Sequence, residues 1–530
     1  MPYRKNSGVN GWVDMMQDDT ASKSQGRSRS AEYRWGRLRR SIEYTTLHRV
    51  PWLALALLAA APASGFASDT TLAKPVQLSS DGAPAATGAL QPPAKGHGLP
   101  DANSKLQGAM SQGYVDNPAI AARRAGQVAV DEGVAQALAA LRPTLTATAS
   151  AGRIEERRFS PDFENRREPQ NARVSASLLL FDGFASINGV RASEARAEAG
   201  RHGLSNSEQR LLSEIAAAYA NIWRDRSIVA LERQNVGFLS EQRRSVKRRL
   251  ELGDLSRTDL AQADARYNEA RANLSAAKAE LVASGSTYTE LVGLPPSKVA
   301  RPLVPDTLFP KTLEAALAEA AANNPLIKKA KADEVAADHD VDARIGAFFP
   351  KITVDAAYDT ATFTSSSFEK STEASAFVRV NFPFYDGGAK ESRYREAKAR
   401  AIEKSYERAA AKRGVWASVR TLWHRRAAAK ARITAASRQL AATELAVRGL
   451  TIEAKVGQRS VIDILDGQRD RVAAKIALVW ARADYVTTSY QLLAAMGKST
   501  PQHLDLPVET YDATTRLASI KRSWLGLFIE

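Results

Sequence analysis

Two short motifs in the chain place a serine three residues before an aspartate. The first pairs Ser256 with Asp259, and the second pairs Ser460 with Asp463. At a helix start, the serine hydroxyl of such a pair accepts a bond from the aspartate backbone, and the carboxylate accepts one from the serine backbone. Each pair therefore predicts a capped helix that begins just after a turn. The turns are expected at two glycines, Gly253 and Gly457.

Asp466 adds a second carboxylate to the later motif. It lies one helical turn beyond Asp463 on the same face, where two like charges mildly destabilise a helix. The earlier motif has Gln262 at the corresponding position. A helix cap does not need this extra charge. The residues therefore leave two interpretations open, a solvated acidic face and a functional acidic site.

No arrangement of residues in the sequence predicts catalysis. There is no nucleophile–base set, glycine-rich phosphate loop or paired-carboxylate hydrolase pattern. The chain has no cysteine, and its 6 histidines are scattered without the spacing of metal ligands. The net charge of +16 is interleaved with acidic residues and matches no nucleic-acid-binding module. We therefore expect no enzyme, no cofactor, no metal site and no nucleic-acid partner.

The elements that would position these residues occur twice along the chain. Three pairs of motifs mark the repeat: Asn117-Pro118 with Asn324-Pro325, Asp182-Gly183 with Asp386-Gly387, and Gly253-x-x-Ser256 with Gly457-x-x-Ser460. A single change of spacing separates the copies, before the Asp-Gly turn. A duplicated unit with one length change indicates a pseudo-symmetric object rather than an enzyme built around one asymmetric cleft.

Each copy contains two amphipathic segments with the two-residue alternation of β-strands. The predicted hairpins span 143–182 and 350–386, and the first encloses a charged loop over 153–171. Two hairpins in one chain leave sheet edges without partners. The edges are satisfied either by closure with other copies into a membrane barrel or by packing as a soluble edge hairpin. The apolar-out, polar-in alternation favours the barrel.

A very long helix without internal proline is expected after each hairpin, over about 188–252 and 390–455. At 1.5 Å per residue, about 65 residues extend roughly 100 Å, several times the diameter of a globular domain. The chain then turns at each glycine and returns through helices over about 258–292 and 462–496. Shorter helices are expected before the hairpins, over about 105–116, 119–141, 312–323 and 326–348.

The segment upstream of the repeats has the three parts of a secretory signal. A basic flank ends at Arg49, an apolar core covers 50–61, and small residues lead to Ala67. We therefore divide the chain into five parts. They are an N-terminal extension with signal peptide (1–67), a flexible linker (68–102), a first repeat (103–297), a second repeat (311–499) and a C-terminal tail (500–530).

The motifs resemble the TolC family of outer membrane export ducts. The resemblance covers roughly 103–510 and is carried by the paired Asn-Pro starts, both Asp-Gly turns and the segment 456–466. It implies a mainly α fold with β, in which four strands per chain contribute to a trimeric twelve-stranded β-barrel. Long coiled helices would form a periplasmic tunnel, with the tail in an equatorial region around it. The implied location is the bacterial outer membrane, spanning into the periplasm.

The resemblance also assigns roles to residues at the two turns. Asp463 and Asp466 would line the narrowest point of the tunnel, so that a trimer places both in one acidic ring that binds cations and slows anions. Arg459 would lock this gate through Asp259 and Thr258, by a charge-assisted bond for which an adaptor competes. The glycines and serines of both turns would be structural caps.

One position departs from the family pattern. Ala454 stands where members of the family can carry a gate tyrosine. We therefore expect the lock to be weaker in this chain or to use another contact.

The implied function is that of an outer membrane exit duct in a tripartite export system. A homotrimer set in outer membrane lipid would work with a periplasmic adaptor protein and an inner membrane ABC or RND transporter. The lack of a lipid-anchor cysteine and the ending Thr500-x-x-x-Leu504-x-Leu506-Pro507 resemble members that serve type I protein secretion. Two alternatives stay open. One is a multidrug or metal efflux duct, and the other is a coiled-coil scaffold, periplasmic or cytoplasmic, which explains the helices but not the signal or hairpins.

Overall fold

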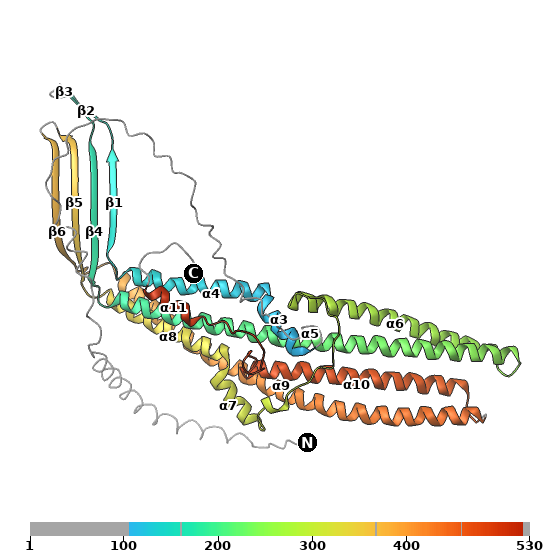
Figure 1. Cartoon of the computed structure of the whole chain (residues 1–530). Helices are drawn as coiled ribbons and strands as arrows, with labels where there is room; N and C mark the ends of the chain where they lie inside the picture. Colours follow the sequence, from blue (N-terminus) through green and yellow to red (C-terminus); the bar gives the residue numbers. More distant parts are fainter. Residues whose placement is uncertain (1–104, 160–161, 366–367, 457, 523–530) are drawn as a thin grey trace, which may run out of the picture. The chain divides into compact units, whose positions relative to one another are not determined.

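The computed structural model describes residues 105–159, 162–365, 368–456 and 458–522. The signal peptide and linker expected within 1–102 lie outside these residues, as does Gly457. One order of elements occurs twice (Figure 1). It first comprises α3 (Leu106–Asp116), α4 (Pro118–Ala139), β1 (Thr144–Ala151), β4 (Gln170–Phe181), α5 (Ala185–Glu251) and α6 (Arg257–Val292). It then comprises α7 (Leu313–Asn323), α8 (Pro325–Gly346), β5 (Lys351–Ser365), β6 (Phe368–Asn381), α9 (Ala389–Lys455) and α10 (Val461–Ala495).

Asparagines begin the second helix of each series. Asn117 and Asn324 each accept a bond of 2.9 Å from the backbone N–H two residues later. Proline follows each asparagine, at a position where its missing N–H costs no hydrogen bond. Each side chain also donates to a carbonyl near the end of a returning helix, Leu291 at 2.9 Å and Ala495 at 2.8 Å. One residue therefore caps a helix and fastens it to the helix that returns beside it.

Strands β1, β4, β5 and β6 form one antiparallel sheet in that order. The register places apolar side chains on one face: Leu145, Ala147, Val174, Ala176, Leu178, Val354, Tyr358, Val378 and Val380. The opposite face carries a polar group centred on Asp355. Its carboxylate accepts from Ser177 at 2.7 Å, from Thr353 at 3.1 Å and from Arg379 at 3.3 Å. Among the described residues, β1 and β6 have no further strand on their outer sides.

The segment predicted as a charged loop contains a second, two-stranded hairpin. Here β2 (Ile154–Phe159) pairs with β3 (Asp162–Arg167) in an antiparallel ladder. Two ion pairs cross it, Arg166 to Glu155 at 3.6 Å and Arg157 to Glu164 at 3.4 Å. Opposite charges facing each other stabilise a strand pair, so this segment forms strands without the apolar alternation that sequence patterns detect.

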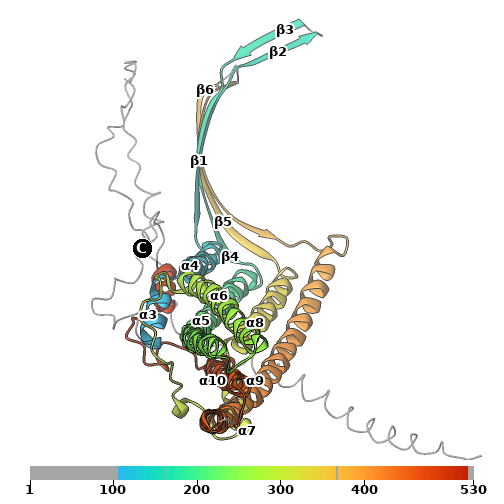
Figure 2. The ribbon, with the colours of Figure 1, turned by 90° about the vertical axis from the view of Figure 1, so that its right-hand side faces the viewer.

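The long helices lie in two antiparallel pairs, α5 with α6 and α9 with α10 (Figures 1 and 2). The pairs are joined because α10 contacts α5, and α8 packs against both α5 and α9. The largest fully buried apolar side chains gather where these helices meet: Tyr219, Tyr288, Leu212, Ile215, Ile222, Leu492 and Leu493. Among the described residues, no helix combines the length and apolar character needed to cross a membrane.

Tight turns connect the strands to the long helices. Asp182 accepts a bond of 2.8 Å from the backbone N–H of Ser186 in the first turn of α5. Gly183 has a φ of +68°, and a Cβ there would collide with the backbone of the α8 end. The following residue, Phe184, is also left-handed at φ +66°, whereas the second series has Gly388 there. The first turn is therefore the more strained of the two.

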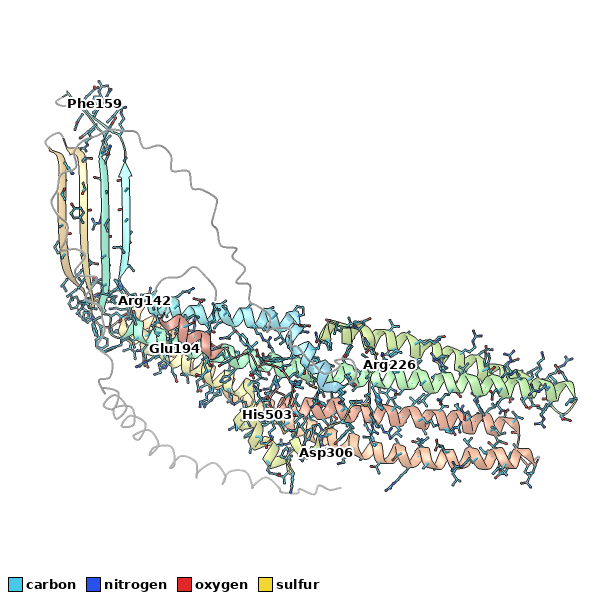
Figure 3. The ribbon with its side chains drawn as sticks, viewed as in Figure 1. Arg142, Phe159, Glu194, Arg226, Asp306 and His503 are labelled. Atoms are coloured by element: carbon cyan, nitrogen blue, oxygen red, sulfur yellow. The ribbon has the colours of Figure 1, made fainter. Side chains whose placement is uncertain are left out.

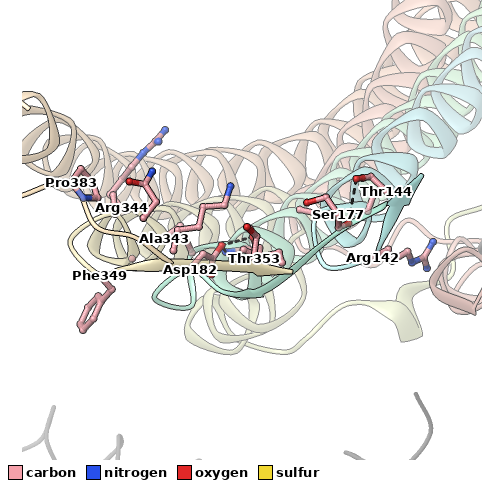
Figure 4. A pocket seen from close by; sticks show the side chains of 18 residues that line it. Arg142, Thr144, Ser177, Asp182, Ala343, Arg344, Phe349, Thr353 and Pro383 are labelled. Atoms are coloured by element: carbon pink, nitrogen blue, oxygen red, sulfur yellow. Dashed lines mark hydrogen bonds between the residues drawn. The ribbon is translucent and has the colours of Figure 1, made fainter. Parts of the chain in front are cut away.

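A cavity of about 580 Å³ lies where the strands meet the helices. Figure 4 shows Arg142, Thr144 and Ser177 on one side of it and Phe349 on the other. Thr144 donates to the carbonyl of Ser177 at 3.3 Å, which joins the first residues of β1 to β4.

Candidate functional site

The turn between α5 and α6 is built by a left-handed glycine and a serine cap. Gly253 has a φ of +84°, a conformation that glycine adopts without steric cost. The N–H and the hydroxyl of Ser256 donate to the Asp259 carboxylate at 2.9 and 2.7 Å, and the Asp259 N–H donates back at 3.2 Å. The bonds from Ser256 stabilise the ionised form and lower the pKa of Asp259. Thr258 is exposed in the same helical turn.

The turn between α9 and α10 repeats this cap. Ser460 donates to Asp463 from its N–H at 3.0 Å and from its hydroxyl at 2.8 Å, and the Asp463 N–H donates back at 3.2 Å. The same cause, hydrogen bonds from Ser460, lowers the pKa of Asp463. Each carboxylate therefore has a structural duty at the start of its helix and stays ionised at neutral pH.

Arg459 forms an ion pair within its own hairpin. Its Nε lies 2.9 Å from Oε2 of Glu453, near the end of α9. This carboxylate raises the pKa of the Arg459 guanidinium. Within the described part of a single chain, Arg459 contacts Glu453 and not the gate partners that the sequence suggested, Asp259 and Thr258. The neighbouring Ala454 offers no polar group that could replace them.

Asp466 has a partner that the sequence did not suggest. Its Oδ1 lies 3.0 Å from Nη2 of Arg266, which belongs to α6 of the other hairpin. Arg266 also reaches Oε2 of Glu269, one turn further along α6, at 3.2 Å. One guanidinium therefore bridges carboxylates of both hairpins. The residue of the second copy that corresponds to Arg266 is Asp470. The internal repeat therefore could not reveal Arg266 as a functional position.

A small apolar cluster joins the same two hairpins beside this ion pair. Leu239 of α5, Ala270 of α6 and Leu465 of α10 are buried together. On α5, Asn235 accepts a long bond of 3.5 Å from the Gln468 amide. We call these contacts, together with the Arg266–Asp466 pair, the tip seam. The seam therefore joins α10 to both α5 and α6 near the helical tips.

A buried polar network lies at the other end of the helical core. Glu208 of α5 accepts from Tyr114 at 3.1 Å and from Arg124 at 3.2 Å. The Arg124 guanidinium lies over the Tyr114 ring at 4.6 Å and the Tyr511 ring at 5.3 Å. Burial raises the pKa of Glu208 and raises that of Tyr114 to about 12. The network therefore holds the C-terminal tail against the first series of helices.

Connecting segments are tied to the helices by similar polar contacts. Arg226 donates to the carbonyls of Pro296 and Ser297, just after α6. Asp306, in the short helix η1 (Asp306–Leu308), pairs with Arg426 and accepts from Tyr485 at 2.8 Å. Figure 3 marks Arg226 and Asp306 along the helical body. These ties fix the segment between the two series, which the sequence showed only as a gap between helices.

Comparison with known proteins places most of the described chain in one family. The model of the family described as "Outer membrane efflux protein" matches residues 110–294 and 316–498. The outer membrane efflux protein BepC of Brucella suis is 34% identical over 423 residues, which cover 80% of this chain and 91% of that protein. The outer membrane protein TolC of Vibrio cholerae is 24% identical over 405 residues, covering 74% and 90%.

Solved structures show the same fold. The CmeC outer membrane channel of Campylobacter jejuni superposes with a TM-score of 0.68 at 13% identity, covering 79% of this chain and 89% of CmeC. The outer-membrane channel OprN superposes with a TM-score of 0.67 at 18% identity. Their long helices and strands therefore correspond to those described above.

Proposed function

Because the chain belongs to the outer membrane efflux protein family, we propose that three copies of it form the exit duct of a tripartite export system. The protein is an outer membrane channel that extends into the periplasm, and it is not an enzyme. A duct lets its cargo pass without changing it chemically. The functional residues are therefore those that shape, line and close the channel. Within each chain, we assign 103–297 and 311–499 to two structural repeats.

The observation that carries the trimer is the sheet with two open edges. Its apolar face is exposed, with Leu145, Val378 and Val380 each more than 60% accessible, while Asp355 organises a polar face behind it. A sheet with one apolar and one polar face suits a barrel wall between lipid and water. Joining β1 of one copy to β6 of the next removes every edge. Three copies then give the twelve-stranded barrel that the family resemblance implies.

Detergent extraction tests the trimer directly. The purified protein is expected to run as an SDS-resistant complex with three times the mass of the mature chain, and to fall to a monomer on heating. A purified protein that stays monomeric and soluble without detergent would contradict the proposal. It would favour the coiled-coil scaffold instead.

We assign the gate to the two helical tips. Asp463 and Asp466 of three chains would form the acidic ring, and Arg459 would reach Asp259 and Thr258 of a neighbouring copy. Two observations support this assignment: these residues lie at the tips, and the Arg459 guanidinium is exposed. An exposed ion pair is weak, so Arg459 can exchange Glu453 for a partner in a neighbouring copy. Gly253, Ser256, Gly457 and Ser460 serve as caps.

Single-channel recordings in lipid bilayers separate these roles. Arg459→Ala is expected to raise conductance because it removes the lock, and unchanged conductance would remove Arg459 from the gate. Replacing Asp463 and Asp466 together by alanine is expected to abolish block by multivalent cations. Block that persists in this double variant would place the acidic ring elsewhere.

For cargo, we propose proteins secreted by a type I system, with a periplasmic adaptor and an inner membrane ABC transporter as partners. The absence of cysteine and the Thr500–Pro507 ending support this choice. The relative BepC is named as an efflux protein, which favours efflux of drugs or metals as the second candidate, with an RND transporter as the alternative partner. A deletion strain distinguishes them. Loss of proteins from the culture supernatant supports secretion, and drug sensitivity alone supports efflux.

A further inference from the structure

We propose that Arg266 is the counter-charge of the acidic ring, which sets how strongly the closed tunnel holds cations. It acts through Asp466 and is therefore a positioning and selectivity residue. The proposal rests on the gate assigned above and adds a residue from the other hairpin to it.

The contact geometry supports a direct electrostatic role. Nη2 of Arg266 lies 3.0 Å from Oδ1 of Asp466, within the range of a charge-assisted hydrogen bond. Both side chains are partly shielded, with 34% and 44% of their surface exposed. A pair in this setting is screened less than a fully exposed one. Arg266 therefore changes the field that a cation meets at Asp466.

Neighbouring groups keep the guanidinium in place. Glu269 holds it from the same helix, at 3.2 Å. The apolar contact of Ala270 with Leu239 and Leu465 fixes α6 and α10 at the distance that the ion pair needs. The pair therefore depends on the closed tip seam, and it is lost if α10 moves away from α6.

The charge balance of the ring follows from this pair. Asp463 is occupied by its helix cap but keeps its negative charge, since its hydrogen bonds come from the neutral Ser460. Asp466, in contrast, faces a cation. Each chain therefore contributes one carboxylate that is hydrogen-bonded to a guanidinium, Asp466, and one, Asp463, that interacts with the Arg459 cation only through space. Movement of α10 would separate Arg266 from Asp466 and expose the second carboxylate as the tunnel opens.

The two repeats show that this arrangement is a feature of the second tip. The position of Asp466 is held by Gln262 in the first copy, and that of Arg266 is held by Asp470 in the second. Oδ1 of Asp470 lies 3.8 Å from Nε of Arg469, the preceding residue. The equivalent positions of the two copies, Gln262 and Asp470, therefore cannot form a second ion pair of this kind.

Bilayer recordings of the full-length trimer test the proposal with La³⁺ as the blocking ion. Arg266→Gln is expected to lower the half-blocking concentration about fivefold, the order of effect of one interaction between unit charges about 4 Å apart in water. It is also expected to shift the reversal potential in a KCl gradient toward cation selectivity. Arg266→Lys, which keeps the charge, should restore most of the wild-type behaviour.

A charge exchange separates electrostatics from packing. The double variant Arg266→Asp with Asp466→Arg keeps the sum of charges and is expected to bring block back from the level of Arg266→Asp alone toward that of the wild type. Arg243→Gln is the matched control, because Arg243 pairs with Asp264 at 2.6 Å but within the first hairpin. The control should leave block and selectivity unchanged.

Two results would overturn the proposal. One is an Arg266→Gln trimer whose block and reversal potential equal those of the wild type, and the other is an equal shift in the Arg243→Gln control. If Arg266→Gln fails to assemble, Arg266→Lys and the charge exchange test the proposal instead. A charge exchange that does not restore block would then contradict the proposal. A wild-type protein that forms no channel would instead refute the proposed function.

Discussion

At the tip of each helical hairpin, a serine and an aspartate cap the returning helix with the same three hydrogen bonds. Corresponding bonds at Ser256 and Ser460 differ by no more than 0.1 Å. One turn later the tips diverge, because Gln262 stands in the first where Asp466 stands in the second. The duplication therefore retains the structural cap and varies the charge beside it. This separation lets mutations address stability and ion binding independently.

The two series also differ at the opposite end of the helices. Tyr114, Arg124 and Glu208 form the buried network of the first series, and the corresponding positions of the second carry Ala321, Lys331 and Lys412. The first series therefore receives the C-terminal tail, while the second has no comparable acceptor for it at these positions. Asymmetry at both ends is built on one repeated scaffold.

Loss of the buried carboxylate is the largest expected effect. Glu208→Ala leaves Arg124, which is 6% exposed, without its buried counter-charge, so we expect a destabilisation of about 3–5 kcal/mol. Lys412→Ala at the corresponding exposed position is the matched control and should cost less than about 0.5 kcal/mol. The temperature at which the SDS-resistant complex dissociates measures both. Equal losses of stability in Glu208→Ala and Lys412→Ala would show that the buried network does not distinguish the first series from the second.

Removal of the caps is expected to have a smaller and symmetrical effect. Ser256→Ala and Ser460→Ala should each cost about 1 kcal/mol, the typical loss for an N-cap serine. Hydrogen exchange of the first-turn amides in α6 and α10 measures each cap separately. Because the cap geometries match, the two losses should agree. A clearly larger loss at Ser460 would mean that Asp463 has a structural role that Asp259 lacks.

Acid is expected to weaken both caps. The bonds from Ser256 and Ser460 lower the pKa of Asp259 and Asp463 below the ordinary value of 3.8. Each cap is therefore fully formed above that value and is lost only as the pH falls through the lower folded-state pKa. The pKa of Glu208 shifts in the opposite direction, because burial raises it. Exchange rates of tip amides, compared with the serine variants from pH 7 to pH 3, test this order.

The long helices and strands could be predicted because their signals are local. The absence of proline and the glycines at the turns placed the long helices over 188–252 and 390–455, and the structure has Ala185–Glu251 and Ala389–Lys455. Alternation found the four sheet strands. It missed β2 and β3, because these strands carry charged residues in succession, without apolar alternation, and are bridged by ion pairs.

The partners of the site could not be predicted in the same way. Arg266 and Asp466 are 200 positions apart, and their contact depends on the rotation of α6 against α10. Arg124 and Glu208 meet only because α4 packs on α5. Residue types and spacing therefore identified the capping aspartates, while the counter-charges had to come from the packing of helices. The gate contacts of Arg459 stay a prediction about neighbouring copies.

The smallest expected effect comes from making the first tip resemble the second. Gln262→Asp places a carboxylate one turn after Asp259, where like charges cost a helix about 0.2–0.5 kcal/mol. The new carboxylate would lack a counterpart of Arg266, because the equivalent position of α10 carries Asp470. We therefore expect a slight loss of exchange protection in α6 and a modest rise in La³⁺ affinity. A rise as large as that of Arg266→Gln would mean that both tips border the ring equally, and the functional difference between the repeats would then have to lie elsewhere.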